Sequence, residues 1–392
     1  MTNFDQIIER RGTHSSKWDN IKKLSGITAD DAIPMWVADM DFAAPPGVTG
    51  ALQESLDRGV HGYYADNGSW AEAACNWMEK RHQAKFKPEW VSPTPGIVSG
   101  LGLILQAVSE PDDEVVLFPP AYHAFRKIIL ANKRKISDAE LVESNRRYVM
   151  DFDSLAKLLT PKTKVVFFCN PHNPGGNAWS PDEIRELADF CISHNLILVS
   201  DEIHCDLIYP HAKHIPTLSA APEVADRLIT CVAATKTFNL AGAHVGACIT
   251  SNADLKRRLD ERIGASGLGS YNAFGMLATE AAWQTGEGWL EELLSYLDSN
   301  RQFFDQTIET AVPGAKSMLL DATYLAWVDF AGTGLSPEVV ANRVKDHARI
   351  FASPGQQFGP GGSNRLRFNF ATPRPILVDA MQRLSDAFSD LR

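Results

Sequence analysis

The sequence predicts an α/β protein whose large domain has a mostly parallel central sheet, accompanied by a smaller α+β domain. Short apolar runs of strand length alternate with segments of helical periodicity through the middle of the chain. Such repetition is typical of a parallel sheet with helices on both faces. The length of 392 residues also exceeds what one hydrophobic core usually carries, which favours two domains.

The middle of the chain supplies the elements of this sheet. Strands are expected at 114–118, 164–169, 196–200 and 228–232. Helices are expected at 48–56, 97–108, 121–131, 151–159 and 181–194. The last of these begins with a cap signature, because Ser180 is followed by Pro181 and by Glu183 at the third position.

The C-terminal third predicts the smaller domain. A long helical pattern at 289–310 is expected to join the two lobes, followed by two strands and two helices, at 325–330, 366–370, 336–348 and 376–391. Residues 1–33 are polar and weakly periodic, which indicates an arm. The expected division is an arm and part of the small domain at 1–45, the large domain at 46–285 and the small domain at 286–392.

Composition excludes several classes of function. A net charge of −10 with no basic stripe argues against nucleic-acid binding. No run of eighteen apolar residues and no signal-like N-terminus is present, so we expect a soluble, cytoplasmic protein without a membrane role. The six cysteines have no metal-site spacing and lie mostly in apolar runs, which fits a reducing compartment and predicts no metal.

Polar side chains follow three of the expected strands. Asn173 follows the run ending at 169, Asp201 follows the next run, and Lys236 follows the run ending at 232. Taken singly, these are a turn residue, a helix-capping acid and a surface lysine. In parallel sheets, however, ligands bind beyond the carboxyl ends of the strands. An amide, a carboxylate and an amine that follow three such strands therefore predict one ligand-binding site.

These segments carry a family resemblance that covers nearly the whole chain. The motifs NPHNPG at 170–175, DEIH at 201–204 and TKTFN at 235–239 resemble those of fold-type I pyridoxal-phosphate enzymes of the aspartate-aminotransferase superfamily. KWD at 17–19, PMWVADMDF at 34–42, DEIHCDL at 201–207 and KTFNLAG at 236–242 are similar to C–S lyases of the cystathionine β-lyase and cystalysin type. The resemblance implies the fold-type I transferase fold, with pyridoxal 5'-phosphate bound in the large domain.

The resemblance also implies a role for each polar residue around the cofactor ring. Lys236 forms the Schiff base with the cofactor aldehyde, and its pKa must be lowered for it to attack as a neutral amine. Asp201 keeps the pyridine nitrogen protonated, so that the ring acts as an electron sink. Asn173 donates to the ring oxygen. Tyr122 stacks on the ring, although a core tyrosine has the same sequence signal.

The cofactor phosphate requires several donors. The resemblance assigns the backbone N–H groups of Ile97 and Val98 and the hydroxyl of Thr235 to it, with Tyr63 reaching it from the partner subunit. The glycine turn before residue 97 suits a phosphate, but it also suits an ordinary capped helix. His244 stands where many aminotransferases have a phosphate-binding arginine, and this departure favours the lyase branch.

Three further residues complete the predicted site. Arg367 matches the family arginine that binds the substrate carboxylate bidentately, with Arg365 as its rival on the same strand face. Ala38, in the PMWVADMDF segment, is expected at the substrate. His204 stands where many aminotransferases have a tyrosine, and we expect it to contact Asp201 or the ring, with simple packing as the alternative.

The predicted function is a C–S β-lyase that eliminates the β-thiolate from cystathionine or cysteine-type amino acids and yields thiol, pyruvate and ammonia. An aminotransferase is the alternative, because it shares the proton removal at Cα. A regulatory or protein-binding role on the same fold is an alternative of another class. The resemblance further implies a homodimer with shared active sites, in which the loop at 267–272 reaches the partner's site.

Overall fold

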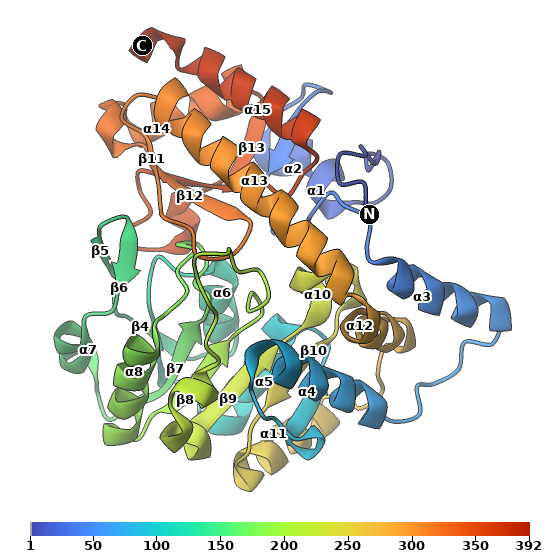
Figure 1. The fold of residues 1–392 in the computed structure, drawn as a ribbon. Helices are drawn as coiled ribbons and strands as arrows, with labels where there is room; N and C mark the ends of the chain where they lie inside the picture. Colours follow the sequence, from blue (N-terminus) through green and yellow to red (C-terminus); the bar gives the residue numbers. More distant parts are fainter. Residues whose placement is uncertain (1) are drawn as a thin grey trace.

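A seven-stranded sheet forms the centre of the larger part of the molecule (Figure 1). The computed structural model describes residues 2–392. The strand order is β2-β10-β9-β8-β7-β3-β4. In chain order these strands are β2 (Val91–Thr94), β3 (Glu114–Leu117), β4 (Lys135–Asp138), β7 (Thr163–Cys169), β8 (Ile197–Asp201), β9 (Leu228–Val232) and β10 (Gly246–Ile249).

The sheet is mostly parallel, as predicted. Strands β4, β3, β7, β8 and β9 run parallel, and β10 is antiparallel to both β9 and β2. The register pairs Cys169 with Asp201 and Asp201 with Cys231. The carboxyl ends of β7, β8 and β9 therefore lie side by side at one edge of the sheet, and the three polar segments that follow them begin at this edge.

Helices cover both faces of this sheet because the side chains of its strands alternate between two apolar clusters. Val115 and Val165 belong to the cluster with α5 and α11, whereas Val116 and Val166 belong to the cluster with α8. The helices of this region are α3 (Pro46–Arg58), α4 (Gly68–His82), α5 (Ile97–Val108), α6 (His123–Ala131), α7 (Phe152–Leu158), α8 (Pro181–Ser193), α9 (Thr217–Ala220), α10 (Ala234–Thr237), α11 (Ala253–Ala265) and α12 (Ala273–Thr285).

A second sheet of five strands forms the smaller part, in the order β1-β13-β14-β12-β11. Its strands are β1 (Ile33–Met35), β11 (Lys316–Ser317), β12 (Leu325–Asp329), β13 (Ile350–Pro354) and β14 (Arg365–Asn369), with a separate hairpin of β5 (Val142–Ser144) and β6 (Arg147–Val149). The long helix α13 (Glu287–Ala311) crosses from the larger part to this sheet (Figure 1). With α14 (Pro337–Asn342) and α15 (Arg374–Ala387) it gives the predicted α+β architecture.

Three of the expected segments differ in the structure. The helix expected at 336–348 is α14 followed by a π-helical turn, Arg343–His347. The helix expected at 376–391 ends at Ala387, before a separate 3₁₀ turn. Within the expected arm, α1 (Ser16–Asp19) and α2 (Ile21–Ser25) are packed, and Lys17 is fully buried against Asp41. Among the described residues, no helix is long and apolar enough to cross a membrane.

Candidate active site

Lys236 lies on α10, in the turn that directly follows β9. Its Nζ donates a hydrogen bond to the carbonyl oxygen of Ala38 at 2.7 Å. Removal from water lowers the pKa of the Lys236 amine to about 8; the positive charge of Arg367 also lowers it, while Asp39 and Asp201 oppose the shift. Lys236 is therefore not the solvated surface lysine that a loop position suggests, and about a tenth of its amine is neutral at about pH 7.

Asp201 ends the neighbouring strand β8 and is nearly completely buried. Its carboxylate accepts a hydrogen bond from the backbone N–H of Ile203 at 3.2 Å, and within residues 2–392 no side chain pairs with it. Burial raises the pKa of Asp201 to about 7, and the charge on Lys236 partly offsets this rise. A buried carboxylate without a side-chain donor fits the protonated nitrogen of a pyridine ring. Asp201 and Lys236 lie at the ends of neighbouring strands, and the charge of each shifts the pKa of the other.

Arg367 reaches the same region from β14 of the second sheet. Its guanidinium is 2% exposed and donates to Asn173 Oδ1 at 2.9 Å and to the carbonyl oxygen of Trp36 at 2.8 Å. Its Nε atom is buried without a partner among the described residues. The rival Arg365 shares the strand face but is ion-paired with Glu143 and Asp329. Its charge is already compensated, so Arg367 is the arginine that has capacity for a carboxylate ligand.

Lys236 and Arg367 border a cavity of about 670 Å³, whereas Asp201, Asn173 and His204 are not among its described lining residues. Ala38, Tyr122, Lys236 and Arg367 all line it. Tyr122 precedes α6 and packs edge-on against Phe125, with 5.6 Å between ring centroids. The volume suits a small aromatic ligand together with an amino acid.

The N-terminus of α5 offers a place for an anion. Ile97 and Val98 are the first two residues of this helix, so their backbone N–H groups lack acceptors within the helix. Gly96 precedes them with φ 82°, a conformation that favours glycine. A Cβ at Gly96 would lie 3.9 Å from His244 Nδ1, so the His244 ring lies beside this helix end. Thr235 comes directly before Lys236 and is buried.

His204 lies buried beside Tyr324. It is buried and forms no hydrogen bond with Asp201; its Nδ1 has no partner among the described residues. Its ring packs edge-on against Tyr324 at 6.3 Å. Burial, Lys236 and Arg367 lower the pKa of His204 to about 3, so the ring is neutral. A contact of His204 with Asp201 or with the cofactor ring therefore stays a prediction.

Two asparagines that the sequence did not single out hold the segment containing Ala38. Asn239 donates to the carbonyl oxygens of Met40 and Phe42 at 3.1 and 2.8 Å. Asn369 donates to those of Val37 and Asp39 at 2.7 and 2.8 Å. Asn239 follows the lysine motif and Asn369 follows Arg367 by two residues. The same two motifs therefore supply functional groups and fix the segment after β1 that faces them.

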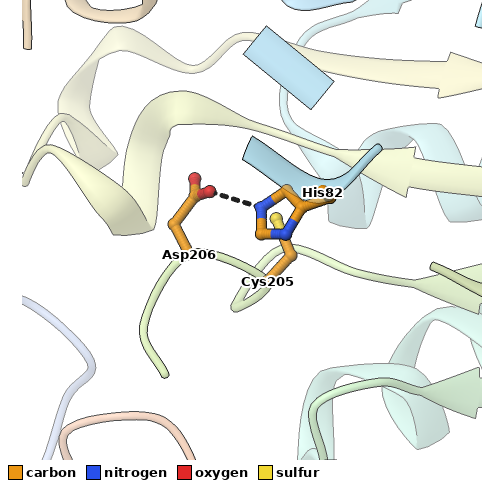
Figure 2. A group of neighbouring side chains, drawn as sticks. All are labelled: His82, Cys205 and Asp206. Atoms are coloured by element: carbon orange, nitrogen blue, oxygen red, sulfur yellow. Dashed lines mark hydrogen bonds and ion pairs between the residues drawn. The ribbon is translucent and has the colours of Figure 1, made fainter. Parts of the chain in front are cut away.

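The buried side chains of His82, Cys205 and Asp206 lie together (Figure 2), and Asp206 contacts Thr237, the residue after Lys236. The Asp206 carboxylate accepts from Thr237 Oγ1 at 2.7 Å and from Trp77 Nε1 at 3.1 Å, and lies 2.7 Å from His82 Nε2. The ligand atoms of His82, Cys205 and Asp206 lie within 4.8 Å of one another, as in a metal site. Because the carboxylate already has these partners, we assign the cluster a structural role in holding Thr237, the neighbour of Lys236.

We expect Asp206→Ala to lower the free energy of unfolding by about 3 kcal/mol, because it leaves several buried donors without an acceptor. Urea denaturation measures this loss. The matched control is Asp182→Ala, whose side chain is 93% exposed and pairs only with Arg185 on its own helix. The control should change stability by less than about 0.5 kcal/mol. Equal stabilities of the two variants would contradict the assignment.

Together, the parallel sheet, the lysine and carboxylate at neighbouring strand ends and the arginine from the second sheet define a fold-type I enzyme of amino-acid chemistry. The chain belongs to the family "Aminotransferase class I and II", whose sequence model matches residues 31–384. The resemblance inferred from the sequence motifs is thereby confirmed.

Curated relatives and solved structures agree with this assignment. The chain is 40% identical to cystathionine beta-lyase PatB of Bacillus subtilis over 99% of this chain and 100% of that protein. It is similar to cystalysin of Treponema denticola, whose crystal structure contains a pyridoxal 5'-phosphate cofactor, with a TM-score of 0.96, 32% identity and full coverage of both chains. A PLP-bound C–S lyase of Staphylococcus hominis has a TM-score of 0.91 and 31% identity, covering 99% and 98%.

Proposed function

We propose that this chain is a pyridoxal-phosphate-dependent C–S β-lyase. It would act on cystathionine or cysteine-type amino acids and release a thiol, pyruvate and ammonia. The observation that carries the reaction type is the full-length similarity to cystathionine beta-lyase PatB at 40% identity. An aminotransferase is the second candidate, supported by the 25% identity to aspartate aminotransferase of Pyrococcus horikoshii over 91% of each chain.

The residues present fit this cofactor. Lys236 would bind the aldehyde carbon of the cofactor, and Asp201 would hold the proton on its ring nitrogen. The N-terminus of α5, together with Thr235 and His244, would bind its phosphate. Asn173, Tyr122 and His204 would contact the ring. When bound, pyridoxal phosphate supplies the electron withdrawal that makes the α-proton of an amino acid acidic.

The protein's own groups then bind and deprotonate the substrate. Arg367 would receive the carboxylate through the donor face that is not used by Asn173 and Trp36, with Ala38 beside it. The free amine of Lys236, with its lowered pKa, would take the proton from Cα.

One assay separates the two reactions. Purified holoenzyme is given L-cystathionine, and thiol and pyruvate are followed with and without an added 2-oxo acid. Formation of pyruvate and thiol without the acceptor is the expected result. Product formation that requires the acceptor would replace the lyase by the aminotransferase, and a bound cofactor without either product would favour a regulatory role.

We also propose a homodimer in which Tyr63 reaches the phosphate of the partner subunit. Tyr63 is 94% exposed in this chain, whereas the Tyr64 hydroxyl donates to Glu280 at 3.1 Å. Tyr63 is therefore the residue with a free hydroxyl. Sedimentation is expected to give a dimer, and Tyr63→Phe to weaken cofactor binding about tenfold without changing the dimer. A monomer with unaltered cofactor affinity in the variant would contradict this.

A cytoplasmic location is supported by the six cysteines, which are all buried and unpaired. Cys231 and Cys248 have their sulfur atoms 3.9 Å apart without a bond. Cell fractionation tests the location, and recovery outside the cytoplasm would contradict it.

We further propose that the chain divides into domains at 1–45, 46–285 and 286–392. Limited proteolysis tests it, since cleavage is expected near residues 45 and 285 rather than within either sheet.

A further inference from the structure

The outer wall of the active-site cavity is formed by one face of α6. His123, Arg126 and Lys127 line the cavity at spacings of three and four residues, which places them on the same side of this helix. The cavity also contains Lys236 and Arg367, but no aspartate or glutamate is among its described lining residues. The charged side chains that line the cavity are therefore all cations.

The cations of this wall differ in whether a carboxylate already compensates them. Arg126 is ion-paired with Asp138 at 2.6 Å, and Lys345 on the opposite wall lies 3.4 Å from Asp346. Lys127 is exposed and has no ion pair or hydrogen bond among residues 2–392. Of the cations on α6 that line the cavity, Lys127 is thus the one that is available to a ligand.

His123 connects Lys127 to the substrate end of the cavity. Both Arg367 and Lys127 act on its ring: burial and these two charges lower the pKa of His123 to about 4, so it is neutral. Its buried Nδ1 has no partner among the described residues. Phe358 lies against the Arg367 guanidinium at 4.8 Å and against the His123 ring at 5.9 Å. Arg367, His123 and Lys127 line the same cavity, and the buried ring of Phe358 packs against the first two.

We propose that Lys127 and His123 form a subsite for an anionic group at the distal end of the substrate. The preferred substrate class is then a β-thioether of cysteine whose S-substituent ends in a carboxylate, bound with its α-carboxylate at Arg367 and its second carboxylate at Lys127. The apolar cavity residues, among them Trp36 and Phe351, suit the methylene groups between the two ends. This inference rests on the proposed lyase function and adds the residues that would bind the distal carboxylate of such a substrate.

The test compares two substrates of similar length that differ in charge, S-(3-carboxypropyl)-L-cysteine and S-butyl-L-cysteine. For the wild-type holoenzyme, kcat/KM is expected to be about tenfold higher for the carboxylate. Lys127→Ala should reduce this preference to about twofold through KM, and Lys127→Arg should restore it. Added salt should weaken the wild-type preference but leave that of Lys127→Ala unchanged.

A binding measurement accompanies the kinetics. Titration calorimetry compares 3,3′-thiodipropionate with 3-(propylthio)propionate, which lack the amino group and are not turned over. The dicarboxylate is expected to bind more tightly to the wild type and equally to Lys127→Ala. The matched control is Lys157→Ala, an exposed lysine on α7 away from the cavity, which should behave as the wild type.

The outcomes separate failure of the subsite from failure of the lyase function. Elimination from both thioethers at equal rates, unaffected by Lys127→Ala, would overturn the subsite and leave the lyase function intact. Absence of elimination from either substrate and from cystathionine would overturn the lyase function. In that case the calorimetry still decides whether Lys127 selects a distal carboxylate.

Discussion

Lys236→Ala is expected to lower the rate of elimination at least about ten-thousandfold. The variant lacks both the amine that holds the cofactor covalently and the base that takes the α-proton. Steady-state pyruvate release measures the loss, and the visible absorption band of the lysine-bound cofactor should disappear at the same time. The Ala38 carbonyl loses its hydrogen-bond donor, but the fold should persist, because α10 is held through Thr237 and Asp206.

Two controls isolate the covalent role of Lys236. Lys236→Arg keeps the charge but cannot form the bond to an aldehyde at neutral pH, so it should be as inactive as the alanine variant. Lys157→Ala removes a distant exposed lysine and should leave activity unchanged. A Lys236→Ala protein that kept activity and a lysine-dependent cofactor spectrum would refute the assignment.

Asp201→Asn is expected to lower kcat by about a thousandfold and to weaken cofactor binding. Without the carboxylate, the ring nitrogen is not kept protonated, and the electron withdrawal from Cα weakens. Substrate binding through Arg367 should change little, so the loss should appear in kcat rather than in KM. A variant with unchanged kcat would show that Asp201 does not face the ring nitrogen.

The cofactor-free protein gives a second readout for Asp201. Its pKa is raised from 3.8 to about 7 in the folded state, so the folded protein binds more protons than the unfolded chain in this window. The contribution of Asp201 to the free energy of unfolding is therefore present at low pH and is lost as the pH rises toward 7. Urea unfolding between about pH 5 and about pH 7 should show this fall in the wild type and a weaker fall in Asp201→Asn. Equal pH dependence would contradict the buried, unpaired state of Asp201.

The sheet and the central site residues were predictable because they depend on local signals. Buried strands such as β7 are continuous apolar runs, and parallel pairing brings their carboxyl ends to one edge. Lys236 and Asp201 each follow such a run directly. Their convergence therefore follows from topology, and the motif resemblance added the identity of the ligand.

Other features depend on contacts between distant segments, which no local pattern records. Lys17 lies in a polar stretch, yet its ammonium is buried 2.7 Å from Asp41. The His204 ring packs against Tyr324, a contact that spacing along the turn does not predict. The hydrogen bond from Thr237 to Asp206 joins residues 31 positions apart. Short edge strands such as β4 were missed because they are half-exposed and lack a distinctive period.

Borohydride reduction of the cofactor-loaded protein fixes any lysine-bound cofactor as a stable phosphopyridoxyl group. Peptide mass spectrometry after proteolysis then locates it. The expected result is one modified peptide per chain, with the added mass on Lys236 and none in the Lys236→Ala variant. A modified lysine elsewhere, or a tightly bound cofactor that leaves Lys236 unmodified, would contradict the proposed site.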